Sequence, residues 1–299
     1  MNIVISGSSG LLGTALCAAL PSAGHRVIRL VRGRGKNESN TAVWDPMTGQ
    51  IETASLSDVD GVIHLAGESI GSGRWTRAKK RRILESREIG TRLLAETVAR
   101  MSPRPGVFLS ASAIGFYGSR GDEILTEESS RGSDFLANVC RVWEEATKPA
   151  SDAGVRVAPL RLGIVLSPDG GALGKMLLPY KLGLGGPIGG GRQWMSWIAL
   201  EDVVGAILHA LAETRIQGAV NLVALNPVIN REFSRALGKA LGRPAFFPIP
   251  GLAIKALFGE MGAATALSSA RVSAELLLKT GYKFVRPRLN EALTSLLTK

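Results

Sequence analysis

The chain has 299 residues, of which 45% are hydrophobic and 20% charged. These values exclude a disordered chain and fit one large α/β domain, with or without a smaller appendage. Lysine and arginine total 36 against 25 aspartate and glutamate, a net charge of +11. This excess suits nucleic acid, an anionic membrane or a phosphorylated small molecule, and equally a basic protein whose charge aids solubility, so charge alone selects no partner.

Cysteine content and hydropathy indicate the cellular compartment in which the chain is expected. The two cysteines, Cys17 and Cys140, lie in apolar segments with helical spacing, which argues against a disulfide framework and a cysteine-based zinc site. The first six residues run directly into a strand-like segment, which leaves no room for a signal peptide. No apolar stretch approaches the roughly 20 residues that cross a bilayer. We therefore expect a reducing, cytoplasmic setting and no stable membrane insertion.

Strand-like and helical patterns alternate through the first half of the chain. Five short β-branched or apolar runs predict strands, and three longer segments with helical spacing predict helices. The strands are expected at residues 2–6, 26–31, 61–65, 107–110 and 155–160, and the helices at 11–20, 79–100 and 134–153. Strands that alternate with helices of this length form a parallel sheet covered on both faces.

The second half of the chain changes character. Residues 183–191 are rich in glycine, and residues 244–250 in proline and phenylalanine. Further helices are expected at residues 201–212, 231–241, 252–258, 269–278 and 289–297, with a strand at 219–223. We predict an α/β fold with a Rossmann-type doubly wound parallel sheet in a cofactor-binding domain over residues 1–225. A smaller, mostly helical and partly interleaved substrate-side lobe follows over residues 226–299.

A glycine-rich loop joins the first strand to the first helix. In this loop Gly7 permits a tight turn, Gly10 lets the backbone approach a pyrophosphate, and Gly13 lets the helix pack against the strand. The helix N-terminus supplies free N–H groups and partial positive charge for phosphates. We therefore assign the loop to a dinucleotide cofactor, through Gly7, Ser9, Gly10, Leu11, Leu12 and Gly13.

The end of the second strand indicates which dinucleotide binds. A carboxylate at this position bonds the ribose 2′-hydroxyl of NAD, whereas this strand ends in Val31-Arg32, followed by Arg34 and Lys36. Asp45 and Glu38 come too late to take the acidic role. A guanidinium binds a 2′-phosphate bidentately, so we predict Arg32 as its ligand and NADP(H) as the cofactor.

Further segments resemble the extended and atypical short-chain dehydrogenase/reductases. His64-Leu65-Ala66-Gly67 resembles the strand end that lines the adenine and ribose, residues 110–118 resemble the segment with the active-site serine, and residues 161–166 resemble the loop at the nicotinamide end. The resemblance implies cofactor contacts from Leu65, Ala66, Gly67, Gly163 and Ile164. More narrowly, segments such as Arg74-Trp75-Thr76, residues 86–91, 185–191 and 193–198, and the C-terminal stretch resemble the epimerase-family, sugar-nucleotide-epimerase-like subgroup.

The catalytic pair of that family has no counterpart here. Its mechanism uses a tyrosine with a lysine four residues later, because a phenol needs a nearby cation to exchange protons near neutral pH. The residues four positions after Tyr117, Tyr180 and Tyr282 are glycine, leucine and arginine, and Cys140 falls roughly where the lysine would be.

Three other residues are candidates for proton transfer. Ser112 could donate a hydrogen bond to a substrate carbonyl or hydroxyl, or satisfy local backbone instead. Tyr117 could replace the missing phenol from another direction, or pack on the loop after its strand. Glu68, just after the third predicted strand of residues 61–65, could act as a general base or contact a ribose.

Other polar features favour ordinary structural roles. The basic stretch from Arg74 to Arg87 has charges on several faces of one helix and little aromatic interleaving, so we expect a solvated helix face. An anionic-substrate role for one or two of these residues is the alternative, and we predict no nucleic-acid partner. The histidines lack metal-ligand spacing, so no metal site is predicted, and His64 is expected to bond backbone.

The predicted function is an NADP(H)-dependent oxidoreductase or epimerase-like enzyme for a small hydroxyl or carbonyl substrate, for example a nucleotide sugar, in a protein that can form homo-oligomers. The alternative is a non-catalytic NADP(H)-binding regulator or scaffold. Some proteins of this subgroup carry names linked to cell or organelle division, which suits that alternative.

Overall fold

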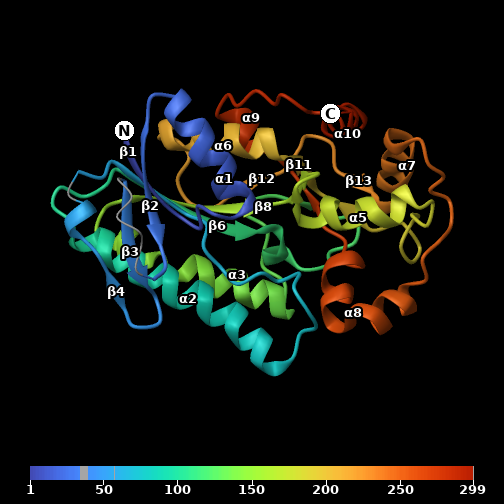
Figure 1. Ribbon diagram of the computed structural model, residues 1–299, viewed down its shortest axis with the longest axis horizontal. Helices are drawn as coiled ribbons and strands as arrows, with labels where there is room; N and C mark the ends of the chain where they lie inside the picture. The colour runs from blue at the N-terminus through green and yellow to red at the C-terminus, as the bar shows by residue number, and fades with distance from the viewer. Residues whose placement is uncertain (34–39, 57, 299) are drawn as a thin grey trace.

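The computed structural model describes residues 1–33, 40–56 and 58–298 (Figure 1). One eight-stranded sheet forms its centre, with the strand order β12-β8-β6-β5-β1-β2-β3-β4. Its strands are β1 (Asn2–Ser6), β2 (Arg26–Val31), β3 (Thr41–Asp45), β4 (Gln50–Ile51), β5 (Gly61–His64), β6 (Val107–Ala113), β8 (Arg156–Leu162) and β12 (Val220–Leu222). All neighbouring strands are parallel except β3 and β4. The predicted Rossmann-type parallel sheet is confirmed.

Helices cover both faces of this sheet. α1 (Leu11–Ser22) and α6 (Leu200–Ala212) pack on one face, and α2 (Arg77–Arg100), α3 (Phe135–Glu145) and α4 (Lys148–Asp152) on the other (Figure 1). The central strands are buried along almost their whole length because both faces are covered. The chain leaves β1 toward β2 on one side and returns to β5 on the other, so the strand order reverses there. Ligands of such folds bind outside the carboxyl ends of the strands at this reversal.

The helix expected at residues 134–153 is interrupted. α3 ends at Glu145, and α4 begins at Lys148 with Pro149 in its first turn. The Thr147 hydroxyl donates to the Glu144 carbonyl at 2.6 Å, which satisfies a carbonyl at the end of α3. Proline lacks an N–H and cannot continue the hydrogen-bond ladder of the helix before it. The prediction of one helix was therefore wrong at this point.

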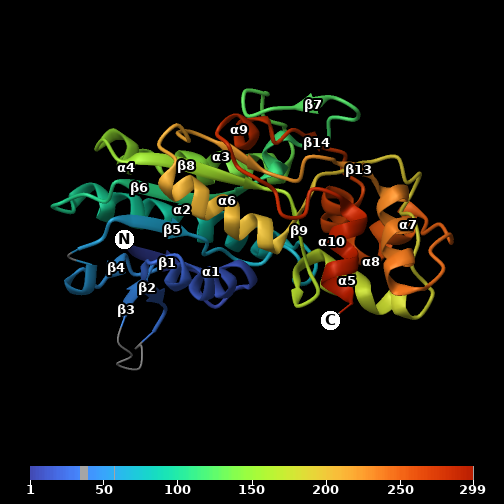
Figure 2. The same ribbon diagram turned by 90° about the horizontal axis from the view of Figure 1, so that it is seen from above.

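Beyond the carboxyl edge of the sheet lies a second, mostly helical lobe. It contains α5 (Gly171–Lys181), α7 (Asn230–Leu241), α8 (Gly251–Ala266) and α10 (Leu289–Leu297), which lie together at the right of Figures 1 and 2. Two short strand pairs, β9 (Ile164–Ser167) with β11 (Trp197–Ala199) and β10 (Trp194–Met195) with β13 (Val228–Ile229), connect this lobe to the sheet.

The core of this lobe comes from both sides of the predicted boundary. Leu173 and Trp197 precede residue 225, whereas Phe233 and Leu293 follow it, and all four are buried in one cluster. The lobe is therefore interleaved with the first domain, and the boundary between residues 225 and 226 stays a prediction. Among the described residues, none of the helices has the length and apolar composition that a membrane span requires.

Two further segments differ from the sequence-based expectation. Residues 269–278 were expected to be one helix, but β14 (Arg271–Val272) pairs with β7 (Ile124–Leu125) and only α9 (Glu275–Lys279) is helical. Conversely, α5 escaped prediction because it contains Gly174 and Pro179. Packing of α5 against the lobe core outweighs the poor helix propensity of these two residues.

Candidate functional site

The loop between β1 and α1 has a backbone geometry that suits an anion. Gly7 has φ +71°, and a Cβ there would lie 2.9 Å from the Ala66 nitrogen; a Cβ on Gly13 would lie 2.2 Å from the Gly7 carbonyl oxygen. The close backbone approach therefore requires glycine at both positions. Gly10 caps α1 without a side-chain hydrogen bond, and the first turn holds no acidic residue. The N-terminal amides of α1 thus remain for phosphate oxygens.

A buried hydrogen-bond chain fixes the segment after β5. The Ser6 hydroxyl accepts from the amides of Leu65 and Ala66 at 3.2 and 3.3 Å and lies 2.6 Å from His64 Nδ1. Burial, aided by a nearby arginine charge, lowers the pKa of His64 to about 3, so the ring is neutral. Because the Ser6 oxygen accepts from two amides, we infer that its hydroxyl donates to an unprotonated Nδ1 of His64. The ring proton is then on Nε2, which donates to the Thr91 hydroxyl at 2.9 Å. The expected bond from His64 to backbone was wrong, since side chains hold the ring.

Arg32 follows β2 directly and is exposed. No carboxylate stands at the end of this strand, and the charge of Arg32 contributes to the lowered pKa of Glu68, which follows β5. The charge of Arg32 therefore acts on the segment after β5. The two lie on opposite sides of the phosphate loop, because β2 and β5 flank β1 in the sheet. Arg34, Lys36 and Glu38 lie outside the described residues. The glycine loop and Arg32 together fit a dinucleotide with a 2′-phosphate.

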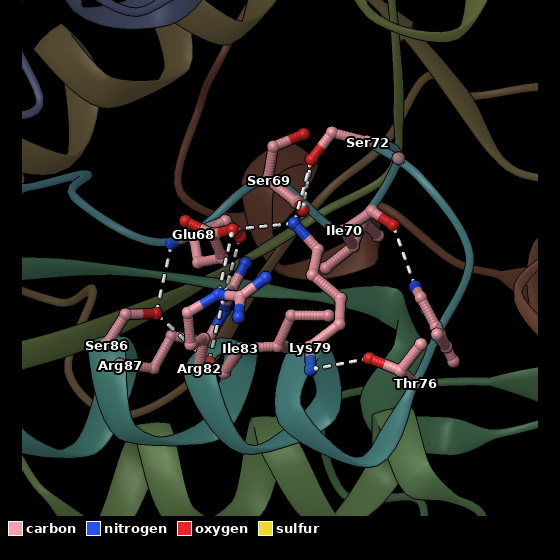
Figure 3. Close-up of polar contacts among 12 residues, drawn as sticks. Glu68, Ser69, Ile70, Ser72, Thr76, Lys79, Arg82, Ile83, Ser86 and Arg87 are labelled. Carbon is pink, nitrogen blue, oxygen red and sulfur yellow. Dashed lines mark hydrogen bonds and ion pairs between the residues drawn. The ribbon is translucent and has the colours of Figure 1, made fainter.

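The loop after β5 carries an ion pair that the sequence did not suggest (Figure 3). Lys79 of α2 donates to Glu68 Oε1 at 2.6 Å and to the Ser72 hydroxyl at 2.8 Å, and Arg82 lies 3.9 Å from the same carboxylate oxygen. The hydrogen bond from Lys79 lowers the pKa of Glu68, and the charges of Arg82 and Arg32 add to this effect against the opposing effect of burial. Glu68 is therefore ionised at neutral pH.

The expected solvated helix face holds for Arg77, Arg81 and Arg82, which are exposed, but was wrong for Lys79 and Arg87. Lys79 and Arg87 are only 5% and 9% exposed. Arg74 donates to a backbone carbonyl of α8 at 2.7 Å, and Lys80 pairs with Glu260 of the same helix at 2.7 Å. Long side chains of this stretch thus connect α2 to the second lobe and to the loop after β5. The buried charge of Lys79 requires a partner, and Glu68 supplies it.

Ser112 belongs to a buried polar network at the end of β6. Its hydroxyl donates to Glu144 of α3 at 2.6 Å, and Arg161 of β8 forms a bidentate pair with the same carboxylate, with both N–O distances 2.9 Å. Ser112 and Arg161 are 1% and 4% exposed. The proton of the Ser112 hydroxyl is therefore committed to Glu144 in this arrangement.

Tyr117, in the short 3₁₀ helix Ile114–Tyr117, extends the same network. Its hydroxyl donates to Asn221 at 2.6 Å and accepts from Arg161 at 3.0 Å, and the side chain is fully buried. Burial raises the pKa of Tyr117, although the charge and hydrogen bond of Arg161 oppose it. The phenol is neutral and turned inward, so this geometry favours a role in holding β6, β8 and β12 together.

Gly163 and Ile164 lie between β8 and β9, with their amides already bonded. The Gly163 amide donates to Leu222 at 3.0 Å and the Ile164 amide to Ser196 at 2.8 Å. A Cβ on Gly163 would lie 2.6 Å from the Ser196 carbonyl oxygen. These two residues can therefore face a cofactor through carbonyl oxygens or the isoleucine side chain, but not through their amides.

Helix α3 offers no cation at the position where a lysine is expected. Cys140 stands there, buried, with its thiol 3.6 Å from the Ala113 carbonyl. Burial and the nearby Glu144 charge raise the pKa of Cys140 to about 12, so the thiol is neutral. Arg141, the next residue, is turned away and pairs with Glu145 at 2.5 Å.

Comparison with known proteins places this site in a family. The model of the NAD dependent epimerase/dehydratase family matches residues 3–222. The chain belongs to this family. A second model, a domain of unknown function named DUF1731, matches residues 249–296. Both matches, with the relatives below, confirm the predicted resemblance to atypical epimerase-family dehydrogenase/reductases.

Relatives of this epimerase-family chain extend over its whole length. An epimerase family protein of Mycobacterium bovis is 41% identical over 291 residues, which cover 97% of this chain and 96% of that protein. The crystal structure of human epimerase family protein SDR39U1 with NADPH has a TM-score of 0.91 at 34% identity, covering 100% of this chain and 99% of that one. A UDP-glucose 4-epimerase from Thermotoga maritima, solved with UDP-glucose, shares only the fold, with a TM-score of 0.78 at 19% identity, covering 99% and 97%.

Sequence reasoning missed four charged residues of this epimerase-family site: Lys79, Arg87, Glu144 and Arg161. One signal for Arg161 was available, because an arginine within an otherwise apolar strand is buried and needs a partner. Lys79 and Arg87 gave no such signal, since their neighbours along α2 are also basic and mostly exposed.

Proposed function

We propose that this protein binds NADP(H) across the carboxyl ends of β2, β1, β5 and β6. The pyrophosphate would lie against Gly10 and on the amides of Leu11 and Leu12, with Ser9 at the loop edge, and Arg32 would hold the 2′-phosphate. The Gly10 amide itself donates to the Gly7 carbonyl at 3.0 Å and so shapes the loop. The observation that carries the proposal is the uncapped N-terminus of α1 beside a strand end that bears Arg32 and no carboxylate. The human relative solved with NADPH supports it.

We further propose an oxidoreductase or epimerase-like reaction on a small hydroxyl or carbonyl substrate. The nicotinamide would supply hydride transfer, and this chain would orient the substrate and handle a proton. Of the three candidates, Glu68 is the one that a substrate can reach, because its side chain is 36% exposed. Glu68 would accept a hydrogen bond or proton from the substrate, while Ser112 and Tyr117 would hold the wall of the site through Glu144 and Arg161.

One observation favours a second candidate, a non-catalytic NADP(H)-binding regulator or scaffold. Ser112 and Tyr117 are buried and fully bonded, and Cys140 supplies no charge to the site. The lowered pKa of Glu68 also makes its carboxylate a weak proton acceptor at neutral pH. A protein with this arrangement could bind the cofactor without turning it over.

Cofactor titration tests the binding proposal. Purified protein is titrated with NADPH and NADH by cofactor fluorescence, together with Arg32→Ala and, as a matched control, Arg100→Ala at the exposed end of α2. A charge-assisted hydrogen bond contributes about 1.5–3 kcal/mol, so Arg32→Ala should weaken NADPH binding by roughly 10- to 150-fold. NADH binding and the control should stay within about twofold of wild type, since neither depends on the 2′-phosphate contact. An absence of NADPH binding, or a preference for NADPH that Arg32→Ala leaves intact, contradicts the proposal.

A substrate screen separates enzyme from scaffold. Wild type and Glu68→Gln are incubated with NADPH and a panel of small carbonyl compounds, and with NADP⁺ and the matching alcohols, while NADPH absorbance is followed. Turnover that falls in Glu68→Gln supports the enzyme, whereas tight cofactor binding without turnover across the panel supports the scaffold. The cytoplasmic setting, the homo-oligomer and the absence of a nucleic-acid partner stay predictions.

A further inference from the structure

Two long basic side chains hold the start of α2 to helix α8 of the second lobe, which lies at the lower right of Figure 1. Arg74, just before α2, donates to the Ala256 carbonyl at 2.7 Å. Lys80, in the first turn of α2, donates to both carboxylate oxygens of Glu260 at 2.7 and 3.0 Å. The segment after β5 and the second lobe are therefore connected directly, in addition to the short strand pairs that join the lobe to the sheet.

The two contacts lie on either side of a break in α8. Gly259 has φ +61° and ψ −142°, so the residues before and after it form two separate helical pieces. The last carbonyls of a helix lack partners within it, and Arg74 donates to one near the end of the first piece, at Ala256. Glu260 begins the second piece. The break thus places a carbonyl and a carboxylate where side chains from α2 reach both.

A third contact comes from α5. This helix begins beside the phosphate loop, since a Cβ on Gly171 would lie 3.7 Å from Leu11 Cδ2. One turn further along α5, Lys175 donates to the Gly71 carbonyl in the segment after β5. We call this contact and the two at α8 the interlobe latch. Because α5 extends from the phosphate loop to the segment after β5, the latch lies over the place where the proposed pyrophosphate would bind.

The contacts of the interlobe latch are of a kind that breaks readily. The side chains of Lys80 and Glu260 are 30% and 49% exposed, and Arg74 and Lys175 are exposed as well. Exposed ion pairs are weak and are screened by salt. The buried core of the second lobe is a cluster separate from the two clusters that cover the sheet. The two sides can therefore part at the latch without exposing a hydrophobic core.

We propose that the interlobe latch controls the entry and release of NADP(H): it opens to admit the dinucleotide and closes over it once bound. This inference rests on the proposed binding of NADP(H), and it concerns the rates of exchange rather than a further contact with the cofactor. The latch joins protein to protein on both sides. Weakening it therefore lowers the barrier to entry and to release alike, and leaves the affinity nearly unchanged.

Stopped-flow fluorescence of NADPH measures both rates, on wild type, Lys80→Gln, Glu260→Gln and the double variant. Each single substitution should raise the association and dissociation rate constants by about two- to fivefold, the effect of losing one exposed ion pair. The Kd should stay within about 1.5-fold of wild type, since the two rates change together. The double variant should go little beyond either single one, because each already breaks the same pair.

The two single variants also separate the latch from electrostatic attraction of the anionic cofactor. Lys80→Gln makes the protein less positive and Glu260→Gln makes it more positive, so attraction alone predicts slower association in the first and faster association in the second. The latch predicts faster association in both. Arg288→Gln and Glu291→Gln are matched controls, because they break an exposed pair at α10 that does not join the lobes; both rates should stay within about 1.5-fold of wild type.

Hydrogen exchange of the ligand-free protein gives a readout that needs no cofactor. Exchange reports local opening, so Glu260→Gln should increase it in residues 70–76 and 251–266 and leave β1 and β5 unchanged. An increase spread over the sheet would instead mean a general loss of stability and would oppose the latch.

The kinetic outcomes distinguish this inference from the proposed function. Rates that stay at wild-type values in both single variants, or association that slows in Lys80→Gln, overturn the latch while NADP(H) binding stands. Faster dissociation alone, with an equal rise in Kd, also overturns it, since the pair would then stabilise only the bound state. If wild type does not bind NADPH, the proposed function fails, and hydrogen exchange alone decides the latch: unchanged exchange in Glu260→Gln overturns it.

Discussion

Glu144→Gln tests whether the network around Arg161 is a structural element. The substitution keeps the shape of the side chain but leaves the Arg161 guanidinium, 5% exposed, without its carboxylate, which is itself 14% exposed. Removing one partner of a buried ion pair costs about 3–5 kcal/mol. Glutamine retains one carbonyl acceptor for Arg161 or Ser112, so we expect a loss near the lower end, about 3 kcal/mol. That loss is a large fraction of a typical stability of about 5–15 kcal/mol.

The assay is urea unfolding followed by circular dichroism, with thermal unfolding as a second measure. A loss of about 3 kcal/mol should lower the melting temperature by roughly 5 °C, because the entropy of unfolding is about 2.1 cal/mol/K for each of the 299 residues. Ser112→Ala removes one hydrogen bond to the same carboxylate and should cost about 1 kcal/mol. Because both substitutions act on Glu144, the double variant should lose less than the sum of the two single losses.

Glu145→Gln provides the matched control on the same helix. Glu145 pairs with Arg141 at the surface, with side chains 57% and 35% exposed, so the change should cost less than about 1 kcal/mol. A loss below about 1 kcal/mol for Glu144→Gln, or strict additivity with Ser112→Ala, would refute the structural role of the network. In that case Glu144 and Ser112 would be better placed among residues that act on a ligand.

Three further predictions follow from single sites. Gly13→Ala should abolish NADPH binding in a fluorescence titration, because its Cβ would lie 2.2 Å from a backbone oxygen, whereas Gly190→Ala, with open space around it, should bind normally. His64 has a folded-state pKa of about 3 against 6.5 for the free side chain, so its contribution is complete above pH 6.5 and is lost as pH falls toward 3. By pH 5 wild type should therefore lose about 2 kcal/mol more than His64→Gln in urea unfolding; equal losses would contradict the neutral ring. Cys140, buried with a pKa of about 12, should resist alkylation by iodoacetamide in the folded protein and react after unfolding, as mass spectrometry can show, while the half-buried Cys17 reacts first.

The sequence by itself determined the features that depend on neighbouring residues along the chain. Alternating apolar runs and helical spacing predicted the parallel sheet and most of its helices. The glycine loop was readable because Gly7 and Gly13 meet local backbone demands, a positive φ and a close strand–helix approach. Arg32 was readable because its position is counted directly from the end of β2. In each case the physical constraint acts within one strand–loop–helix unit, so the spacing of residues records it.

Only the tertiary structure decided which charged and hydroxyl side chains meet. Arg161 contacts Tyr117, 44 residues away, and Glu144, 17 residues away, whereas Lys79 reaches Glu68 across the loop before α2. Ser112 and Glu68 were chosen from the sequence as equivalent candidates, and the fold buries one and leaves the other partly exposed. The free energy of a polar group depends on its burial and on its partners, and both are set by distant segments that pack together. The sequence pattern of an isolated helix or strand contains no record of them.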